Sequence, residues 1–462
     1  MPSDPEPPRG ADEARVETIP ETSPTGSPAT DSPLSGGAAG AETPRASYRA
    51  LLDVPSLWRV LLAMQIARIA QSMIGIVAIL FALQRYDSPP LAGAVAFMSI
   101  APGMVISPIA GALLDRHGRV RLIILDYCVA TASLFLIAGL SAANRLPASL
   151  LLAIVAVSSL TGPLSSSGLR SLFPLMVPER LWERVNAVDS NGWVLASLVG
   201  TPAGAVLAQT IGFEPALSII ATAFLVAGLV IIGAPDPRTD VHSTGNLLRD
   251  AWLGLVYTWN NRTLRALAIS LSTMNLSGGV IQIVIPIIVL DRLGMGESTV
   301  GYMFGLMGAC GVVSAFLSGR LKTGGRERIM IVLPAYGFTL ASVVLLWPAG
   351  LLPVVLSMAI GGLVNGPMDI AMFTLRQRVT DPAWMGRAFT VSMNLNFSGY
   401  PIGAAIAGQL VGLSLEWTIL FAVATNLLGA LLAQLLIPQT RETPASQASG
   451  TAGERPAPEP GS

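Results

Sequence analysis

Residues 57–83 read LWRVLLAMQIARIAQSMIGIVAILFAL, an apolar run in which Arg59 and Arg68 are the charged residues. About 20 residues of α-helix cross the hydrocarbon core of a bilayer, so this run is long enough to span a membrane. Eleven comparable stretches follow, at residues 90–114, 120–141, 148–172, 187–210, 213–234, 264–290, 298–319, 328–348, 351–375, 387–411 and 416–437. The sequence therefore predicts an all-α integral membrane protein with twelve transmembrane helices.

The composition agrees with a membrane protein. The chain is 52% hydrophobic and 12% charged, whereas soluble domains are about 25% charged. Its formal net charge is zero, which gives no electrostatic reason to expect a nucleic acid partner, so the lipid bilayer is the expected surrounding. Cys128 and Cys310 lie in separate apolar stretches, and neither a disulfide framework, a metal site nor a cofactor is expected.

The positive charges of the connecting loops alternate along the chain. Seventeen Lys and Arg residues lie in or beside the even-numbered loops, and three, Arg85, Arg145 and Arg292, lie in the odd-numbered ones. Short loops rich in Lys and Arg stay in the cytoplasm. The pattern predicts a multi-pass protein of the cell membrane with both termini in the cytoplasm.

The chain divides into tails, two sets of six helices and a linker. Residues 1–50 and 438–462 are rich in Pro, Ser, Ala and Gly, a composition that is too polar to bury a core, so both are expected to be disordered cytoplasmic tails. The predicted six-helix sets are 51–234 and 264–437. A cytoplasmic linker, 235–263, joins them.

The two sets of helices resemble copies of each other. Gly200-Thr-Pro202 recurs as Gly399-Tyr-Pro401 at a shift of 199 residues, and Gly162-Pro163 recurs as Gly366-Pro367 at a shift of 204. Several matches in the same order, with nearly equal shifts, indicate an internal duplication. Duplicated membrane halves place a binding site near the middle of the bilayer between them.

The loop after the second apolar stretch reads Gly111-Ala-Leu-Leu-Asp115-Arg116-His-Gly118-Arg119. It resembles the major facilitator superfamily signature Gly-x-Leu-Ala-Asp-Arg-x-Gly-Arg. Gly118 can supply the turn that reverses the chain, and the arginines suit the anionic cytoplasmic face. The resemblance implies two pseudo-symmetric six-helix lobes, alternating access, and an Asp115 latch to the opposite lobe.

A finer resemblance concerns the subgroup. The run from Pro178 to Asn186, and the later run that includes Gly386-Arg387, look like the macrolide and siderophore exporters of this superfamily. The resemblance therefore favours efflux of an amphipathic, drug-like or siderophore-like compound.

In this fold the first, fourth, seventh and tenth helices line the central cavity, so their polar residues are the candidates for substrate binding. On the first helix the candidates are spaced as on one helical face. The full set is Gln65, Arg68, Ser72, Thr161, Ser165, Asn275, Gln282, Asn365 and Asp369.

Charged residues inside the apolar stretches are the most informative, because a charge in the bilayer usually faces water or a partner. Arg68 is expected to meet an anionic or hydrogen-bonding part of the substrate, with a contact to Asp369 as the structural alternative. Asp369, Asp189 and Asp126 are the candidates for carrying a proton. For Asp189 and Asp126 the alternative is pairing with the basic loops.

The sequence contains no Gly-x-Ser-x-Gly, Walker or His-Glu-x-x-His motif, so no enzyme activity is expected. The leading hypothesis is a monomeric secondary transporter that exports a small amphipathic molecule in exchange for protons. An importer of a small organic anion would suit Arg68 equally well. A non-transporting membrane scaffold or sensor is the hypothesis from another class.

Overall fold

The computed structural model describes residues 48–51, 53–236, 247–319, 325–347, 350–381 and 384–439, apart from some side chains inside these ranges, among them that of Asp115. Every regular element of the described residues is a helix. The predicted tails lie almost wholly outside these ranges, and so does part of the linker. The domain boundaries and the disorder of the tails therefore stay predictions.

The helices before the linker form the first half. They are η1 (Tyr48–Leu51), α1 (Leu57–Tyr86), α2 (Pro89–Met98), α3 (Ala101–His117), α4 (Arg119–Ala142), α5 (Ala148–Met176), η2 (Glu179–Leu181), α6 (Trp182–Ile211) and α7 (Phe213–Ile231). The linker contains the helix α8 (Leu247–Asn260).

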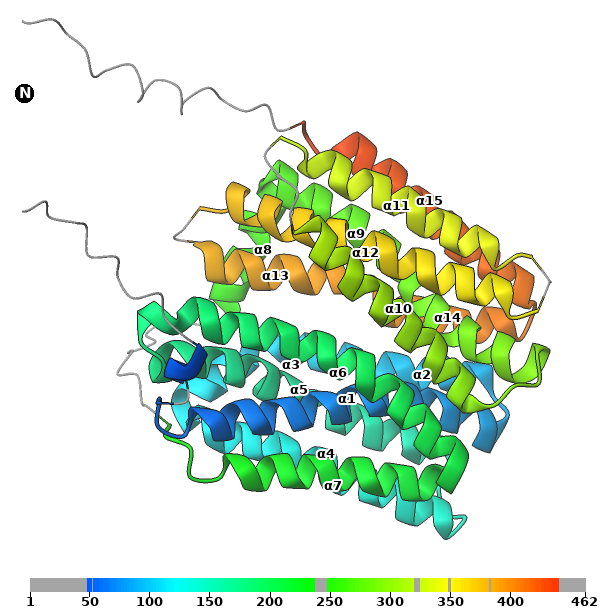
Figure 1. The fold of residues 1–462 in the computed structure, drawn as a ribbon, viewed down its shortest axis with the longest axis horizontal. Coiled ribbons are helices and arrows are strands. Elements are labelled where there is room, and N and C mark those ends of the chain that lie inside the picture. Colours follow the sequence, from blue (N-terminus) through cyan, green and yellow to red (C-terminus); the bar gives the residue numbers. More distant parts are fainter. Residues whose placement is uncertain are drawn as a thin grey trace, which may run out of the picture. The chain divides into compact units, whose positions relative to one another are not determined.

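The helices after the linker form the second half. They are α9 (Arg262–Ile287) with the π-helical turn η3 (Ile288–Arg292), α10 (Glu297–Ser318), α11 (Glu327–Val344), α12 (Leu352–Val379), α13 (Met385–Phe397), α14 (Gly399–Val411) and α15 (Leu415–Leu436). Figure 1 shows the two halves, the first in blue to green and the second in yellow-green to red.

The helices match the predicted spans. Eleven helices of the described residues are long and apolar enough to cross a membrane. The remaining predicted span, 387–411, is occupied by α13 and α14, which are separated at Ser398. The prediction of an all-α membrane fold is thus confirmed, with two spans divided into shorter helices.

Both divisions lie just before a proline. The break between α2 and α3 precedes Pro102, and the break between α13 and α14 precedes Pro401. Proline cannot donate a backbone hydrogen bond, and its ring clashes with the carbonyl group four residues earlier. Those carbonyl groups belong to Met98 and Phe397, the last residues of α2 and α13. The local sequence therefore explains why these two spans are not single straight helices.

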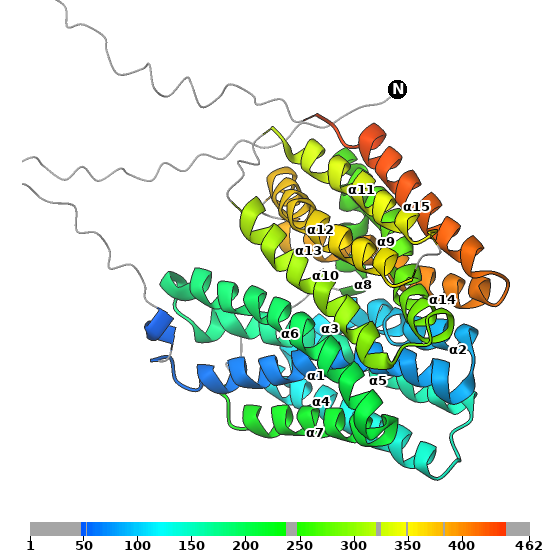
Figure 2. The same cartoon turned by 45° about the vertical axis from the view of Figure 1, so that its right-hand side comes forward.

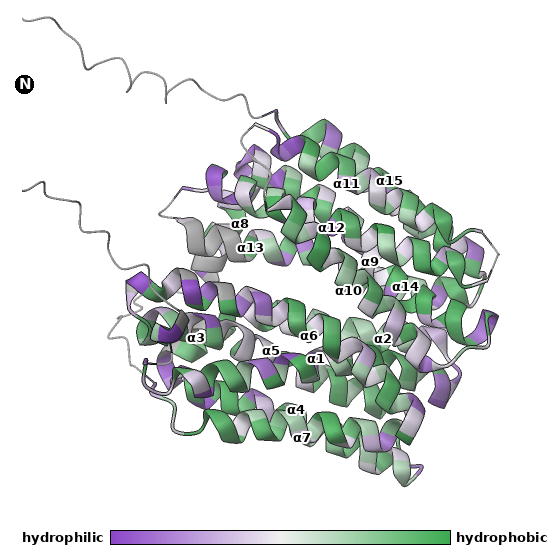
Figure 3. Cartoon of the chain, viewed as in Figure 1, coloured by the Kyte–Doolittle hydropathy of each residue, from purple (hydrophilic) through white to green (hydrophobic). Residues whose placement is uncertain are grey.

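The surface has the character of a membrane protein. Hydrophobic residues run along the bodies of the helices, and hydrophilic ones gather mainly toward their ends (Figure 3). Leu413, Trp417 and Leu435 are 83%, 68% and 75% exposed. Large exposed apolar surface of this kind is rare on soluble monomers and is stable in contact with lipid.

The helices of each half pack in the same order. In the first half α1 contacts α6 and α7, α4 contacts α5 and α7, and α3 contacts α5. In the second half α9 contacts α14 and α15, α11 contacts α12 and α15, and α10 contacts α12. The duplicated sequence has therefore produced two pseudo-symmetric bundles.

The two halves meet mainly through α6 against α10 and α2 against α14 (Figure 2). These contacts lie toward the odd-numbered loops. A Cβ added to Gly301 of α10 would lie 2.7 Å from the Cβ of Ala205 and 2.9 Å from the Cα of Pro202. Glycine thus lets the backbones of the halves approach closely. Toward the even-numbered loops, α8 contacts α3 and α13.

Close helix packing in the second half leads to a stability prediction. A Cβ on Gly279 of α9 would overlap the backbone of α14 at Tyr400 and Ala404. We expect Gly279→Val to lower the stability of the purified protein by about 1–3 kcal/mol, because the helices must separate. Thermal unfolding in detergent measures the change. Gly139→Val is the control, since a Cβ there meets nothing within 4 Å; equal effects would contradict the prediction.

Candidate functional site

A cavity of about 600 Å³ lies between the halves and is bordered by both. The first half contributes residues of α1 and α6, and the second half contributes residues of α9 to α15. Most of the wall is apolar, with Gly and Met the most frequent apolar residues, and Ser and Asn supply most of its polar part. The cavity is therefore asymmetric, since the second half supplies most of its surface.

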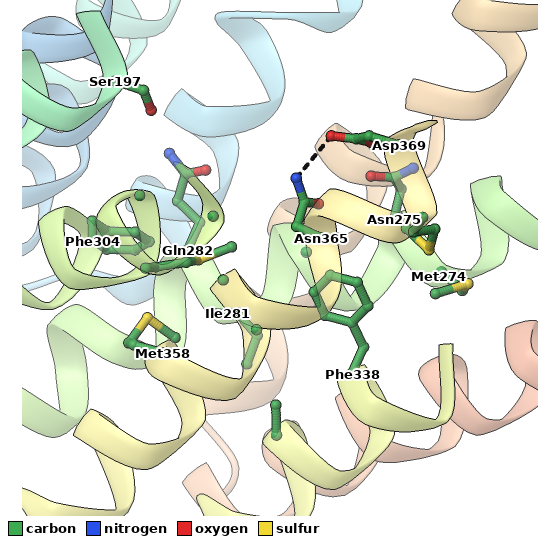
Figure 4. A pocket seen from close by; sticks show the side chains of 18 of the residues that line it. Ser197, Met274, Asn275, Ile281, Gln282, Phe304, Phe338, Met358, Asn365 and Asp369 are labelled. Atoms are coloured by element: carbon green, nitrogen blue, oxygen red, sulfur yellow. Dashed lines mark hydrogen bonds between the residues drawn. The ribbon is translucent and has the colours of Figure 1, made fainter. Parts of the chain in front are cut away.

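Asp369 is the only charged side chain among the described residues that line the cavity. Its Oδ2 accepts a hydrogen bond of 2.8 Å from Nδ2 of Asn365, one turn earlier on α12 (Figure 4). Within the described residues this is its one hydrogen bond, and no ion pair reaches it. A carboxyl group in such a place needs a proton or an external cation to balance its charge.

Two further polar residues of the cavity connect separate helices. Nδ2 of Asn275 on α9 donates to the backbone oxygen of Asn396 at 3.0 Å and lies 3.1 Å from its Oδ1. Nε2 of Gln282 donates to the carbonyl oxygen of Gly75 on α1 at 3.4 Å, across the two halves. Ser72 also lines the wall on α1. Five of the predicted substrate residues are therefore brought together: Ser72, Asn275, Gln282, Asn365 and Asp369.

Arg68 is not one of the residues that line this cavity. It is 6% exposed and forms an ion pair with the carboxylate of Asp189 on α6. Its Nη1 donates to the backbone oxygen of Asp189 at 2.7 Å, and its guanidinium lies 4.7 Å from the ring centre of Trp193. The alternative contact between Arg68 and Asp369 is wrong, because this face of α1 packs against α6 and not toward α12.

Two more residues, Gln65 and Arg170, take part in the polar contact around Asp189. Nε2 of Gln65 donates to the carbonyl oxygen of Gly192 at 3.1 Å, and Nε of Arg170 on α5 lies 3.5 Å from Oδ2 of Asp189. The negative charge of Asp189 is therefore balanced by two arginines inside the first half. The polar face predicted on α1 is therefore divided. Gln65 and Arg68 contact α6, and Ser72 lines the cavity.

Asp126 lies in a second polar contact of the first half. It is 6% exposed on α4, and its carboxylate lies beside the hydroxyl groups of Thr161 and Ser165 on α5, which donate to the backbone oxygens of Ser158 and Gly162. Asp126, Thr161 and Ser165 do not line the cavity. The residues predicted on the fourth span thus lie between two helices of one half.

The loop motif contains an interaction that the sequence did not reveal. Gly118 has a φ of 91°, a backbone conformation that favours glycine, as predicted. Directly after it, the amides of Arg119 and Val120 donate to Oδ1 and Oδ2 of Asp236 at 3.0 and 3.2 Å. A linker carboxylate therefore caps the beginning of α4.

The other motif residues are placed in less detail. Nε of Arg119 donates to the hydroxyl of Ser171 on α5 at 3.0 Å, and Arg116 is exposed. The contacts of Gly111 and of the Asp115 side chain are not among those that the structure describes, so the Asp115 latch stays a prediction.

Two pseudo-symmetric helix bundles around a central cavity define the architecture of a membrane transporter. The model of the Major Facilitator Superfamily matches residues 60–404, and the chain belongs to this family. The prediction of a transporter, and not an enzyme, is confirmed, and a non-transporting scaffold is not supported.

Relatives cover most of the chain. An uncharacterized transporter of the same family, y4rN of Sinorhizobium fredii, is 35% identical over 400 residues, which are 85% of this chain and 97% of the relative. The multidrug efflux pump Tap of Mycobacterium tuberculosis is 25% identical over 78% of this chain and 88% of its own. The enterobactin exporter EntS of Escherichia coli is 23% identical over 65% and 72%.

The fold is also found among solved structures. The nucleoside transporter NupG aligns with a TM-score of 0.66 at 11% identity, covering 83% of this chain and 99% of that structure. At this identity the similarity concerns the fold alone.

The ion pair in the first half yields a second prediction. Arg68→Ala should lower the stability by about 3–5 kcal/mol, because it leaves the Asp189 carboxylate with reduced compensation in a buried place. The double variant Arg68→Met with Asp189→Leu should be more stable than the single one. Thermal unfolding in detergent measures both, with Arg145→Ala at an exposed arginine as the control. A single variant that is as stable as the control would contradict a structural role of the pair.

Proposed function

We propose that the protein exports an amphipathic, drug-like or siderophore-like compound and that protons moving inward drive the export. The observation that carries this proposal is the lone carboxylate of Asp369 in a largely apolar cavity. The walls suit the apolar part of such a compound, while Asn275, Asn365 and Gln282 offer hydrogen bonds to its polar part. Export by the distant relatives Tap and EntS supports the direction.

Asp369 is the preferred proton carrier because of its partners. Asp189 is already held by Arg68 and Arg170, and Asp126 is buried on α4 and does not line the cavity. Asp369 has Asn365 alone among the described residues and borders the space that the substrate would occupy. Proton binding there can therefore respond to whether the cavity is filled.

The arrangement of the halves supports alternating access. Contacts between the halves concentrate toward the odd-numbered loops, which the loop charges predict to be outside the cell. A state closed on the outer side is the one that an exporter loads from the cytoplasm. We propose that the halves then rock about the cavity, in a single chain acting as a monomer.

Import of a small organic anion has less support. An anion site in a membrane cavity needs a cationic partner, and no Arg, Lys or His is found among the described residues that line this cavity. Arg68, on which that alternative depended, is engaged by Asp189.

The proposed coupling predicts a specific defect. Asp369→Asn should abolish uphill export driven by a pH gradient, because the amide cannot carry the proton, while downhill exchange of substrate continues. Uptake of a lipophilic dye that the wild type exports, measured in proteoliposomes with and without a pH gradient, separates the two. Asp87→Asn makes the same chemical change at an exposed residue and should leave both rates unchanged. If the Asp369→Asn protein still concentrates the dye, Asp126 or Asp189 becomes the candidate.

The proposed orientation predicts the location of the loops and the C-terminus. Green fluorescent protein, which is fluorescent only when it folds in the bacterial cytoplasm, should be bright when fused after Ser462. Fused after Asn144, in an odd-numbered loop between α4 and α5, it should be dark. The reverse result would show that the loop charges do not orient this chain.

A further inference from the structure

The cavity extends beyond the boundary between the halves into the second half itself. Its wall includes Phe338, Ala341 and Ser342 of α11 and Asn426 of α15. These two helices pack against each other on the side of the second half that is away from α1 and α6, neither of which they contact appreciably. The extension is therefore a pocket of the second half alone.

The sides of this pocket are apolar. Phe338 projects from α11 toward the α12 residue Asn365, with Met274 of α9 nearby (Figure 4). Across from the ring, a Cβ added to Gly361 would lie 3.8 Å from Cε1 of Phe338. The glycine thus leaves room beside the aromatic ring.

The inner end of the pocket is polar. Nδ2 of Asn426 donates to Oγ of Ser277 at 2.8 Å, lies 2.9 Å from Oγ of Ser342, and reaches the carbonyl oxygen of Phe338 at 3.3 Å. Within the described residues no donor reaches the amide oxygen of Asn426. That oxygen can therefore accept a hydrogen bond from a bound ligand.

The corresponding helices of the first half pack differently. There α4 and α7 are joined by Tyr127 against Phe224, with ring centroids 6.1 Å apart. Both side chains are buried, at 2% and 4% exposure. Two aromatic rings therefore fill the first half where the second half leaves a pocket.

We propose that this pocket between α9, α11, α12 and α15 binds an aromatic or similarly rigid apolar group of the substrate, one that carries a hydrogen-bond donor for Asn426. The proposal rests on the proposed function in that the cavity is the substrate site. It adds that the second half alone holds the apolar group, while the polar end of the substrate reaches Asn365 and Asp369. The first half can then move without breaking these contacts.

Thiol chemistry tests whether the pocket is accessible. In a background with Cys128→Ser and Cys310→Ala, Ser342→Cys should react with benzyl methanethiosulfonate. Ser141→Cys, at a serine of α4 that is 2% exposed, as Ser342 is, and that does not line the cavity, is the matched control and should react much more slowly. N-phenyl-1-naphthylamine, a neutral aromatic compound with one N–H donor, should protect Ser342→Cys. Equal reactivity of the two cysteines, or no protection, would overturn the proposal.

A second pair of variants tests where the aromatic group binds. Gly361→Leu should fill the pocket and weaken binding of N-phenyl-1-naphthylamine, followed by its fluorescence, by roughly tenfold. Gly162→Leu makes the same change on α5, where an added Cβ meets nothing within 4 Å and the residue does not line the cavity, and should have little effect. Equal losses, or no binding to the wild type, would contradict the pocket.

This test is independent of proton coupling. The probe is neutral, so Asp369→Asn should still bind it. If Asp369→Asn still exports uphill and Ser342→Cys is still protected, the proposed coupling is refuted and the pocket is not. If Ser342→Cys is not protected although uphill export depends on Asp369, the pocket alone is refuted.

Discussion

The structure depends on one constraint: inside a bilayer, water is not available to charged or polar groups, so the protein must supply their partners. The first half meets this constraint internally. Arg68 and Arg170 both pair with Asp189, which links α1, α5 and α6, and Asp126 lies buried beside the hydroxyl groups of Thr161 and Ser165. These contacts fix the helices of that half relative to one another and leave no charge of their own on the cavity wall.

The second half meets the same constraint differently. Asp369 has an amide as its partner and faces the cavity, so its charge depends on what enters from outside. The neighbouring walls are apolar or carry amides. The two halves of the duplicated fold have thus become unequal: the first pairs Arg68 and Asp189 within itself, and the second presents polar groups to the cavity that a substrate or proton can engage.

Glycine residues allow helix backbones to lie close together, both between the halves and within the second half. Gly301 lies against Pro202 and Ala205 at the boundary, and Gly279 lies against the backbone of α14. Because lipid gives no hydrophobic force between helices, such contacts are stabilised by the fit of the surfaces. Substitutions at these positions therefore affect assembly more than chemistry.

The sequence by itself determined the helical membrane fold, because spans of about 20 apolar residues and unequal loop charges depend on the bilayer alone. The loop motif and the repeats also predicted the family and the duplication, and polar spacing found Asn275, Asn365 and Asp369. Only the tertiary structure decided that Arg68 faces Asp189 and that Asn426 borders the cavity. A helical period shows which residues share a face, but not which neighbouring helix that face meets.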